Sequence, residues 1–366
     1  MSIILFILIV CVLILVHEFG HFIVAKKFGI RVDEFGIGFP PRALKLFKKG
    51  ETEYTLNWIP FGGFVKIFGE NPVEEIDGVD SERNFSRKPK LVQAAVLVAG
   101  VFFNLLFAWG LISVGFMVGL PTAVSSVPTE SLSGNIPELT ITSVIDGSPA
   151  DLAGLLPGDV IIAAGSGQNQ IAKDIDGQTV MDIISTSSSE NPLELVYQRG
   201  DDEKTVQIIP STELVDHPIV GITMDSIVTV QFSFFKSIWQ GAKTTIFMFW
   251  ETAKSLGNLL LDSVRGKADL STVAGPIGIA GIAGDAYDFG WVYLLFFTSL
   301  ISINLAVINL IPFPALDGGR LFIILIETIT RRKVKPSVFA LVNTVGFILL
   351  ILLMVVITFN DIRNIL

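Results

Sequence analysis

The sequence is poor in charge and in cysteine. Only 17% of its 366 residues are charged, and the mean hydropathy of +0.63 lies well above that of an ordinary soluble globular protein. This composition disfavours a soluble protein and predicts integration into a membrane. The single cysteine, Cys11, excludes an internal disulfide and gives no indication of the redox compartment.

The sequence contains several long apolar runs. Four of them come close to the about 20 residues that cross a bilayer, at residues 3–25, 91–119, 292–315 and 336–358. The first run has no basic residue ahead of it and no small-residue cleavage site at its end. It is therefore expected to be a retained helix, and not a cleaved signal peptide.

The charges that do occur are unevenly placed. Residues 26–90 contain twelve Lys or Arg, whereas residues 121–231 contain sixteen Asp or Glu against three basic residues. Because basic loops remain on the cytoplasmic side, residues 26–90 are predicted to be cytoplasmic, together with Arg331, Arg332, Lys333 and Lys335. Four crossings then place both termini and the acidic segment outside the cytoplasm.

Two further segments have a recognisable pattern. Residues 31–66 contain short alternating runs such as "YTLNWIPF" and "GFVKIF" between Gly and Pro, which predicts a β-rich loop that is either cytoplasmic or membrane-dipping. Residues 232–262 mix large aromatic side chains with three Lys and Glu251, which favours an amphipathic helix on the membrane surface over a fifth span. The polar residues 71–88 are expected to be a surface connection.

A domain of ordinary soluble composition follows a Ser-, Thr- and Pro-rich linker at residues 122–138. The stretch "LTITSVIDGSPADLAGLLPGDVIIAAGSG" predicts a strand, a turn at Asp146-Gly147, a short helix near Pro149 and a strand after Asp159. It resembles a PDZ domain through Ser148, Pro149, Ala150, Ala153, Gly154, Leu155, Gly158, Asp159 and Ile161. The alternative is an unrelated small α+β domain.

The chemistry is concentrated in the first apolar run, "VLILVHEFGHFIVAKK". His17 and His21 are four residues apart, so a helix presents both on one face, where two imidazoles can bind one metal ion. With Glu18 they form the His-Glu-x-x-His pattern of zinc proteases. An ionisable side chain at bilayer depth costs about 2.5–3.5 kcal/mol on insertion scales, which favours a functional site over the alternative of polar residues at a helix end near the surface.

A third protein ligand must come from elsewhere, because a catalytic zinc has three protein ligands and one open position. The only other histidine, His217, lies in the acidic outward segment. The best candidate is the carboxylate of Asp317 in "NLAVINLIPFPALDGGR". Pro312 and Pro314 end the third span, and the adjacent glycines are expected to give the backbone freedom to turn the carboxylate inward.

These motifs occur in one chain with "FGIGFPP", "AGVFFN" and "VAGPIGIAG". In combination the sequence resembles the site-2 protease family (M50) of intramembrane zinc metalloproteases, in particular its regulator-of-sigma-E protease (RseP) branch. The resemblance implies a polytopic α-helical membrane protein with about four transmembrane helices, a β-rich membrane-associated loop and an inserted extracytoplasmic α+β PDZ-like domain. The implied division is 1–120, 121–231, 232–290 and 291–366.

The resemblance also assigns roles to single residues. It implies that His17, His21 and Asp317 hold Zn²⁺ and that Glu18 is the general base on zinc-bound water. Its supporting residues are Asn309, which would help to hold the substrate strand or the reaction centre, Asn104 near the site, and Pro312 and Pro314. For both asparagines an interhelical hydrogen bond is the alternative. The second-span motif of the family often has Pro after its Gly, and here Val101 follows Gly100.

The implied activity is that of a zinc metalloendopeptidase in the bacterial cytoplasmic membrane. Its partners would be the lipid bilayer and single-span membrane proteins such as anti-sigma factors or signal-peptide remnants, with no nucleic acid. The β-rich loop could supply an edge strand for an extended substrate, or be a plain hairpin. One PDZ-like domain is seen where well-known Gram-negative relatives have two, which leaves Gram-positive or deeper-branching relatives equally open.

Two other classes of function compete with this hypothesis. An inactive membrane scaffold could use the PDZ-like domain to capture peptide tails, but a scaffold has no use for a costly buried metal site. A solute or metal transporter would show internal repeats and paired broken helices, whereas the sequence has no internal repeat and one broken span.

Overall fold

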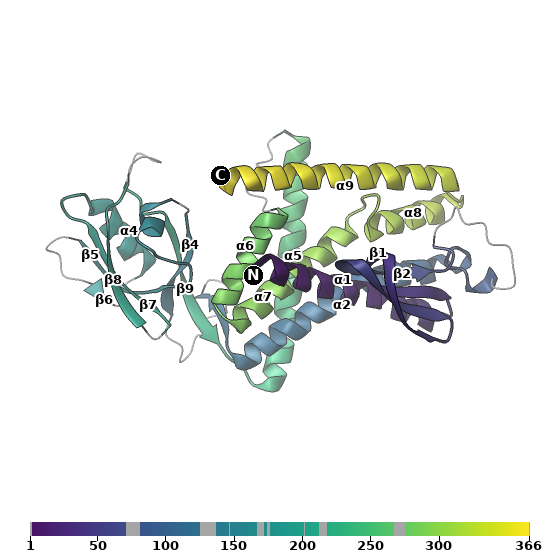
Figure 1. Cartoon of the computed structure of the whole chain (residues 1–366), viewed down its shortest axis with the longest axis horizontal. Helices are drawn as coiled ribbons and strands as arrows, with labels where there is room; N and C mark the ends of the chain where they lie inside the picture. Colours follow the sequence, from purple (N-terminus) through teal and green to yellow (C-terminus); the bar gives the residue numbers. More distant parts are fainter. Residues whose placement is uncertain are drawn as a thin grey trace. The chain divides into compact units, whose positions relative to one another are not determined.

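The structure, a computed structural model, describes residues 2–70, 81–124, 137–145, 147–166, 172–173, 176–200, 202–211, 218–266 and 275–365. Residues 71–80 of the polar connection, residues 125–136 of the linker, Asp146 and His217 lie outside the described residues. The chain divides into two compact units, whose elements are labelled in Figure 1. Unit 1 comprises Met1–Gly115 and Phe234–Leu366, and unit 2 comprises Phe116–Ser233.

Four helices are long and apolar enough to cross a membrane, which confirms the four predicted runs. They are α1 (Ser2–Lys27), α2 (Lys90–Val118), α7 (Trp291–Leu310) and α9 (Pro336–Ile365). Helix α7 ends before the predicted limit at residue 315. Ile311, which precedes Pro312, has an extended backbone, as is usual for a residue before proline.

Among the described residues, unit 1 contains three more α-helices. The predicted amphipathic helix is α5 (Phe234–Val264), which leaves Phe235, Trp239 and Phe247 exposed. The sequence did not lead us to expect α6 (Pro276–Asp288) or α8 (Asp317–Thr330). The buried carboxylate of Asp361 on α9 accepts hydrogen bonds from three backbone N–H groups at the start of α6, at 2.9–3.1 Å. A carboxylate is well suited to this place, because the first N–H groups of a helix have no partner within it.

The β-rich loop is an antiparallel pair of long strands, β1 (Val32–Lys49) and β2 (Thr52–Ile67), that folds back on itself. Residues 34–37 of β1 pair with residues 53–56 on one side and with residues 63–66 on the other. Among the described residues no strand pairs with the second side of residues 63–67. The end of β2 is therefore an edge strand, and this edge faces α1.

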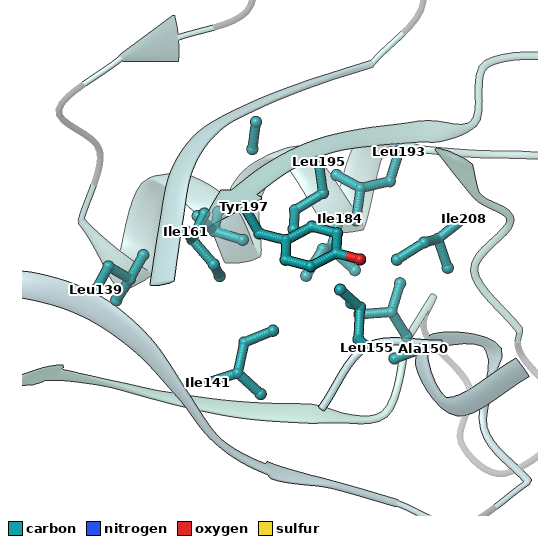
Figure 2. Close-up of a cluster of buried hydrophobic side chains, with 13 residues drawn as sticks. Leu139, Ile141, Ala150, Leu155, Ile161, Ile184, Leu193, Leu195, Tyr197 and Ile208 are labelled. Carbon is teal, nitrogen blue, oxygen red and sulfur yellow. The ribbon is translucent and has the colours of Figure 1, made fainter. Parts of the chain in front are cut away.

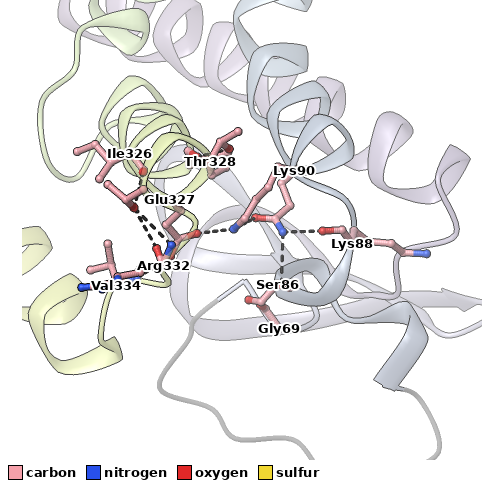
Figure 3. A network of polar contacts seen from close by, with 12 residues as sticks. Gly69, Ser86, Lys88, Lys90, Ile326, Glu327, Thr328, Arg332 and Val334 are labelled. Atoms are coloured by element: carbon pink, nitrogen blue, oxygen red, sulfur yellow. Dashed lines mark hydrogen bonds and ion pairs between the residues drawn. The ribbon is translucent and has the colours of Figure 1, made fainter.

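A polar network joins the start of α2 to the end of α8, as Figure 3 shows. Glu327 accepts hydrogen bonds from Lys90 and, at 2.8 Å, from the backbone N–H of Val334. Gln93 donates to the carbonyl of Lys88 at 2.7 Å. The two bonds of Glu327 hold α8 at its C-terminal end, and α8 begins with Asp317.

The described residues of unit 2 form a seven-stranded antiparallel sheet with two short helices. The strand order is β3-β9-β4-β5-β7-β8, and β6 pairs with β5. The strands are β3 (Leu120–Ala123), β4 (Glu138–Val144), β5 (Val160–Ser166), β6 (Ala172–Lys173), β7 (Leu193–Arg199), β8 (Asp202–Ile208) and β9 (Ile222–Val230), and the helices are α3 (Pro149–Leu152) and α4 (Gly177–Thr186).

The core of unit 2 is apolar. Side chains from β4, β5 and β7 meet those of α3 and α4 in one buried cluster that includes Ile141, Leu155 and Tyr197, as Figure 2 shows. The strand, short helix and second strand expected from the sequence are present as β4, α3 and β5, and Ser148 caps α3 by accepting from the N–H of Asp151. The PDZ assignment itself stays a prediction.

Candidate metal centre

Helix α1 presents two imidazoles on one face, as the four-residue spacing predicts. His17 and His21 are both buried, with 7% and 6% of their surface exposed. Their Nε2 atoms lie 3.2 Å apart, and the two rings are nearly perpendicular. Two nitrogen lone pairs therefore converge on one point inside unit 1.

A carboxylate from the other end of the chain completes the group. Oδ2 of Asp317, the first residue of α8, lies 3.0 Å from Nε2 of His17 and 3.1 Å from Nε2 of His21. The structure therefore brings together the three side chains that the sequence singled out.

The two Nε2 atoms and Oδ2 of Asp317 form a triangle of donor atoms, and its size fits a zinc ion. Zinc–ligand bonds of about 2.0–2.1 Å in tetrahedral geometry put the ligand atoms about 3.3–3.4 Å apart, and the three donor atoms here are separated by 3.0–3.2 Å. Two imidazoles and one carboxylate also match the donor set of catalytic zinc, which leaves a fourth position open. The residues present therefore fit the metal.

Helix α2 contacts both imidazole rings at Nδ1, the nitrogen that does not point at the metal position. Nδ1 of His21 donates to the carbonyl of Val96 at 2.8 Å, which fixes Nε2 as the free ligand nitrogen. Nδ1 of His17 lies 3.2 Å from the amide nitrogen of Asn104, and Oδ1 of that buried amide has no partner in the described part of the chain. A half-turn of the amide would present Oδ1 to His17 as the acceptor that a ligand imidazole needs at its second nitrogen.

Two glycines allow α1 and α2 to approach this closely. A Cβ atom at Gly100 would lie 2.5 Å from Nε2 of His21, and one at Gly20 would lie 2.5 Å from the carbonyl oxygen of Ala99. Any larger residue at either position would push the helices apart at the level of the imidazoles. Val101, which takes the place of a common family proline, is buried in α2 and leaves that helix continuous.

Glu18 is next to the triangle and is held by the edge strand. The backbone N–H of Val65 on β2 donates to Oε2 of Glu18 at 3.0 Å. Glu18 directly follows the candidate ligand His17 in α1. The structure thus places an acidic group beside the donor atoms without making it one of the three.

The role expected of the glycines after Asp317 was wrong. Gly318 and Gly319 lie in the first turn of α8 and do not have the positive φ that would require glycine. Their Cβ positions are instead blocked by the carbonyl oxygens of Ile311 and Phe313. They are needed because the chain between α7 and α8 runs directly over the start of α8.

The remaining supporting residues are less closely tied to the triangle. Asn309 is half-buried near the end of α7, and no hydrogen bond joins its side chain to the three donor groups among the described residues. Pro312 and Pro314 lie between α7 and α8 and line a small apolar cavity with Phe322 and Phe339. Their role as supporting residues stays a prediction.

Comparison with known proteins decides the family. The profile of Peptidase family M50 matches residues 5–353. A Clostridium perfringens protein that carries a zinc metalloprotease name is 36% identical over 351 residues, covering 96% of this chain and 95% of its own. The zinc metalloprotease RasP of Geobacillus kaustophilus is 29% identical over 440 residues, covering 99% and 98%.

The chain belongs to peptidase family M50. It is a zinc metalloprotease, as the sequence motifs predicted, and its cofactor is Zn²⁺. The four apolar helices and the membrane-protease relatives make it a membrane protein.

Sequence reasoning did not find every group that contacts the centre of this M50 peptidase. The carbonyl of Val96 and the N–H of Val65 are backbone groups, so no residue type signals them. Asn343 on α9, which contacts the chain just before Asp317 at 2.8 Å, did have a signal: an amide within an apolar span is costly unless it is paired.

Proposed function

We propose that this M50 peptidase hydrolyses peptide bonds within or near the transmembrane segments of other membrane proteins. The observation that carries the proposal is the convergence of His17, His21 and Asp317 on one point, with two of the three ligands on a helix apolar enough to cross a membrane. Placed there, the centre acts on peptide bonds that ordinary soluble proteases do not reach.

His17, His21 and Asp317 are the zinc ligands in this proposal. Zinc in their midst would polarise the scissile carbonyl and lower the pKa of a coordinated water. Asn104 fixes the orientation of His17 through its second ring nitrogen, as the Val96 carbonyl does for His21.

Glu18 is the general base and then the general acid. Its Oε2 is held by the N–H of Val65, so we assign proton transfer to Oε1. Oε1 accepts a proton from the attacking water and returns it to the leaving amine. The same N–H couples the position of the base to the edge strand.

The edge strand at residues 63–67 is the proposed substrate site. A cavity of about 480 Å³ is lined by this strand and by α9, with Phe64, Val65, Lys66 and Asn343 among its lining residues. A substrate that has left its helix needs partners for its backbone amides, and the backbone groups of this edge other than the Val65 N–H, which holds Glu18, can supply them by β-addition. Val65 lines this cavity and also donates to Glu18, so the proposed base lies beside the proposed substrate site.

We further propose a bacterial cytoplasmic membrane location, with four crossings and both termini outside. Unit 2 is then the extracytoplasmic PDZ-like domain, which limits access by substrates with bulky outer parts. The acidic composition of residues 121–231 and the basic residues 26–90 support this orientation. Single-span proteins already trimmed on the outer side, such as anti-sigma factors or signal-peptide remnants, are the expected substrates.

The test compares zinc content and cleavage in detergent. Wild type is expected to hold about one zinc per chain and to cleave a single-span model substrate, whereas Glu18→Gln keeps the zinc and loses about 10²–10⁴-fold in rate. Glu251→Gln on the exposed face of α5 is the matched control and should cleave like wild type. Cleavage that survives Glu18→Gln would refute the general base, and full zinc without wild-type cleavage would favour the scaffold.

A further inference from the structure

The chain between α7 and α8 places the third ligand, and it has an unusual backbone. Ala315, two residues before Asp317, has φ of 72°. This left-handed region is crowded for a residue with a Cβ atom and needs support from its surroundings. The position of Asp317 therefore depends on what holds Ala315.

The support comes from α9. The backbone N–H of Ala315 donates to Oδ1 of Asn343 at 2.8 Å, across 28 residues of sequence. One turn further along α9, Gly346 lies against Pro314, where a Cβ atom would come within 2.9 Å of the Pro314 carbonyl oxygen. Asn343 and Gly346 share one helix face, so α9 contacts this segment through a hydrogen bond and a close backbone approach.

Most of the apolar stretch of α9 is exposed. The apolar stretch of α9 is only 6% buried within the structure. The neighbours of Asn343 on α9, Val342 and Thr344, are exposed. A buried or lipid-facing amide without a partner is costly, and Asn343 has the Ala315 N–H as its partner.

From these contacts we propose that Asn343 is a positioning residue for the metal ligand Asp317. It acts through the Ala315 N–H, which it holds so that the left-handed turn delivers the carboxylate to the two imidazoles. The proposal rests on the ligand role of Asp317 put forward above. The alternative is that Asn343 only attaches α9 to the rest of unit 1, without any effect on the metal.

Zinc affinity separates these roles. It is measured on the full chain in detergent by equilibrium competition with a chelator of known affinity. Asn343→Leu keeps the branched shape and the number of side-chain heavy atoms but removes the acceptor, and we expect zinc affinity to fall by about 10- to 100-fold, as for other partners that orient a ligand. Adding Ala315→Gly should recover part of the loss, because glycine adopts the left-handed conformation without a Cβ clash.

Two controls make the result specific. Asp361→Asn weakens the other attachment of α9, at the start of α6, and should leave zinc affinity within about twofold of wild type, since it does not touch the Ala315 turn. Asp317→Asn should itself lose zinc. If Asn343→Leu does not yield folded protein, Asn343→Gln, which keeps an amide but moves its oxygen by one methylene, should show a smaller loss in the same direction.

Each outcome has one reading. Wild-type affinity in Asn343→Leu together with loss in Asp317→Asn refutes the positioning role and leaves the proposed function intact. Wild-type affinity in both variants refutes the ligand role of Asp317 itself. An equal loss in Asn343→Leu and Asp361→Asn, with no recovery by Ala315→Gly, shows that Asn343 only attaches α9.

Discussion

At the scale of single residues, the His17 and His21 rings are held by α2, a helix that contributes no ligand. A glycine, an amide and a backbone carbonyl of α2 lie within contact distance of the two imidazoles. Protein interiors are packed closely enough for an added methyl group to be felt. The precision of the centre therefore depends on residues that sequence motifs mark only weakly.

Gly100 gives the sharpest test of this packing. We expect Gly100→Ala to lower peptidase activity by about 100-fold, because a Cβ atom would displace the His21 and His17 rings and small misplacements near a reaction centre are costly. Gly110→Ala in the same helix is the control, since a Cβ atom there meets nothing within 4 Å. Equal activity of the two variants would contradict the packing argument.

Asn104 is tested by changing its chemistry while its branched side-chain shape is kept. Asn104→Leu should lower zinc affinity by about 10- to 100-fold, because Nδ1 of His17 loses its acceptor. Asn104→Asp keeps an oxygen acceptor and should retain most of the affinity. If both variants bind zinc like wild type, the interhelical hydrogen bond is the better account of this residue.

The ligands themselves could be predicted because their signal is local. His17, Glu18 and His21 lie within about one turn of the same helix. Asp317 is a carboxylate next to a broken span. The reason for Gly318 and Gly319 could not be predicted, because glycine serves close packing and unusual φ equally well. The choice depends on the approach of Ile311 and Phe313, which only the tertiary structure reveals.

At the scale of elements, the end of β2 links the proposed base to the proposed substrate site. Its N–H at Val65 contacts Glu18, and the cavity beside it runs towards α9. The sequence predicted β structure in this region from alternation and turns. It could not predict which edge stays unpaired, because β1 pairs on both sides at residues 34–37.

Crosslinking tests the edge strand. In a Cys11→Ser, Glu18→Gln background, a cysteine at Lys66 should form a disulfide with a substrate cysteine near the scissile bond, because Lys66 lines the cavity. A cysteine at Lys45, on the exposed far part of β1, is the control and should not crosslink. The reverse pattern would exclude substrate binding along residues 63–67.

Helices α6 and α8 were not expected because they are short and glycine-containing. The stretch that begins α8 reads as a turn, since two glycines follow Asp317. The two glycines leave room for the carbonyl oxygens of Ile311 and Phe313, so a helix can begin at Asp317. Propensity is a weak guide where tertiary contacts decide.

At the scale of the whole molecule, the proposed extracytoplasmic location of unit 2 rests on the distribution of charge. With Cys11→Ser as background, a cysteine at the exposed Glu203 should react with a membrane-impermeant maleimide in intact bacterial cells. A cysteine at Lys333 should react only after permeabilisation, because basic loops stay cytoplasmic. Labelling of Lys333→Cys alone in intact cells would invert the proposed topology.

The most direct test of the account is the zinc K-edge X-ray absorption spectrum of the purified, zinc-loaded protein. Two imidazoles and an oxygen ligand are expected at about 2.0–2.2 Å with no sulfur scatterer, and one imidazole should be lost in His21→Ala. A spectrum without two imidazoles, or one unchanged by His21→Ala, would contradict a centre built from His17, His21 and Asp317.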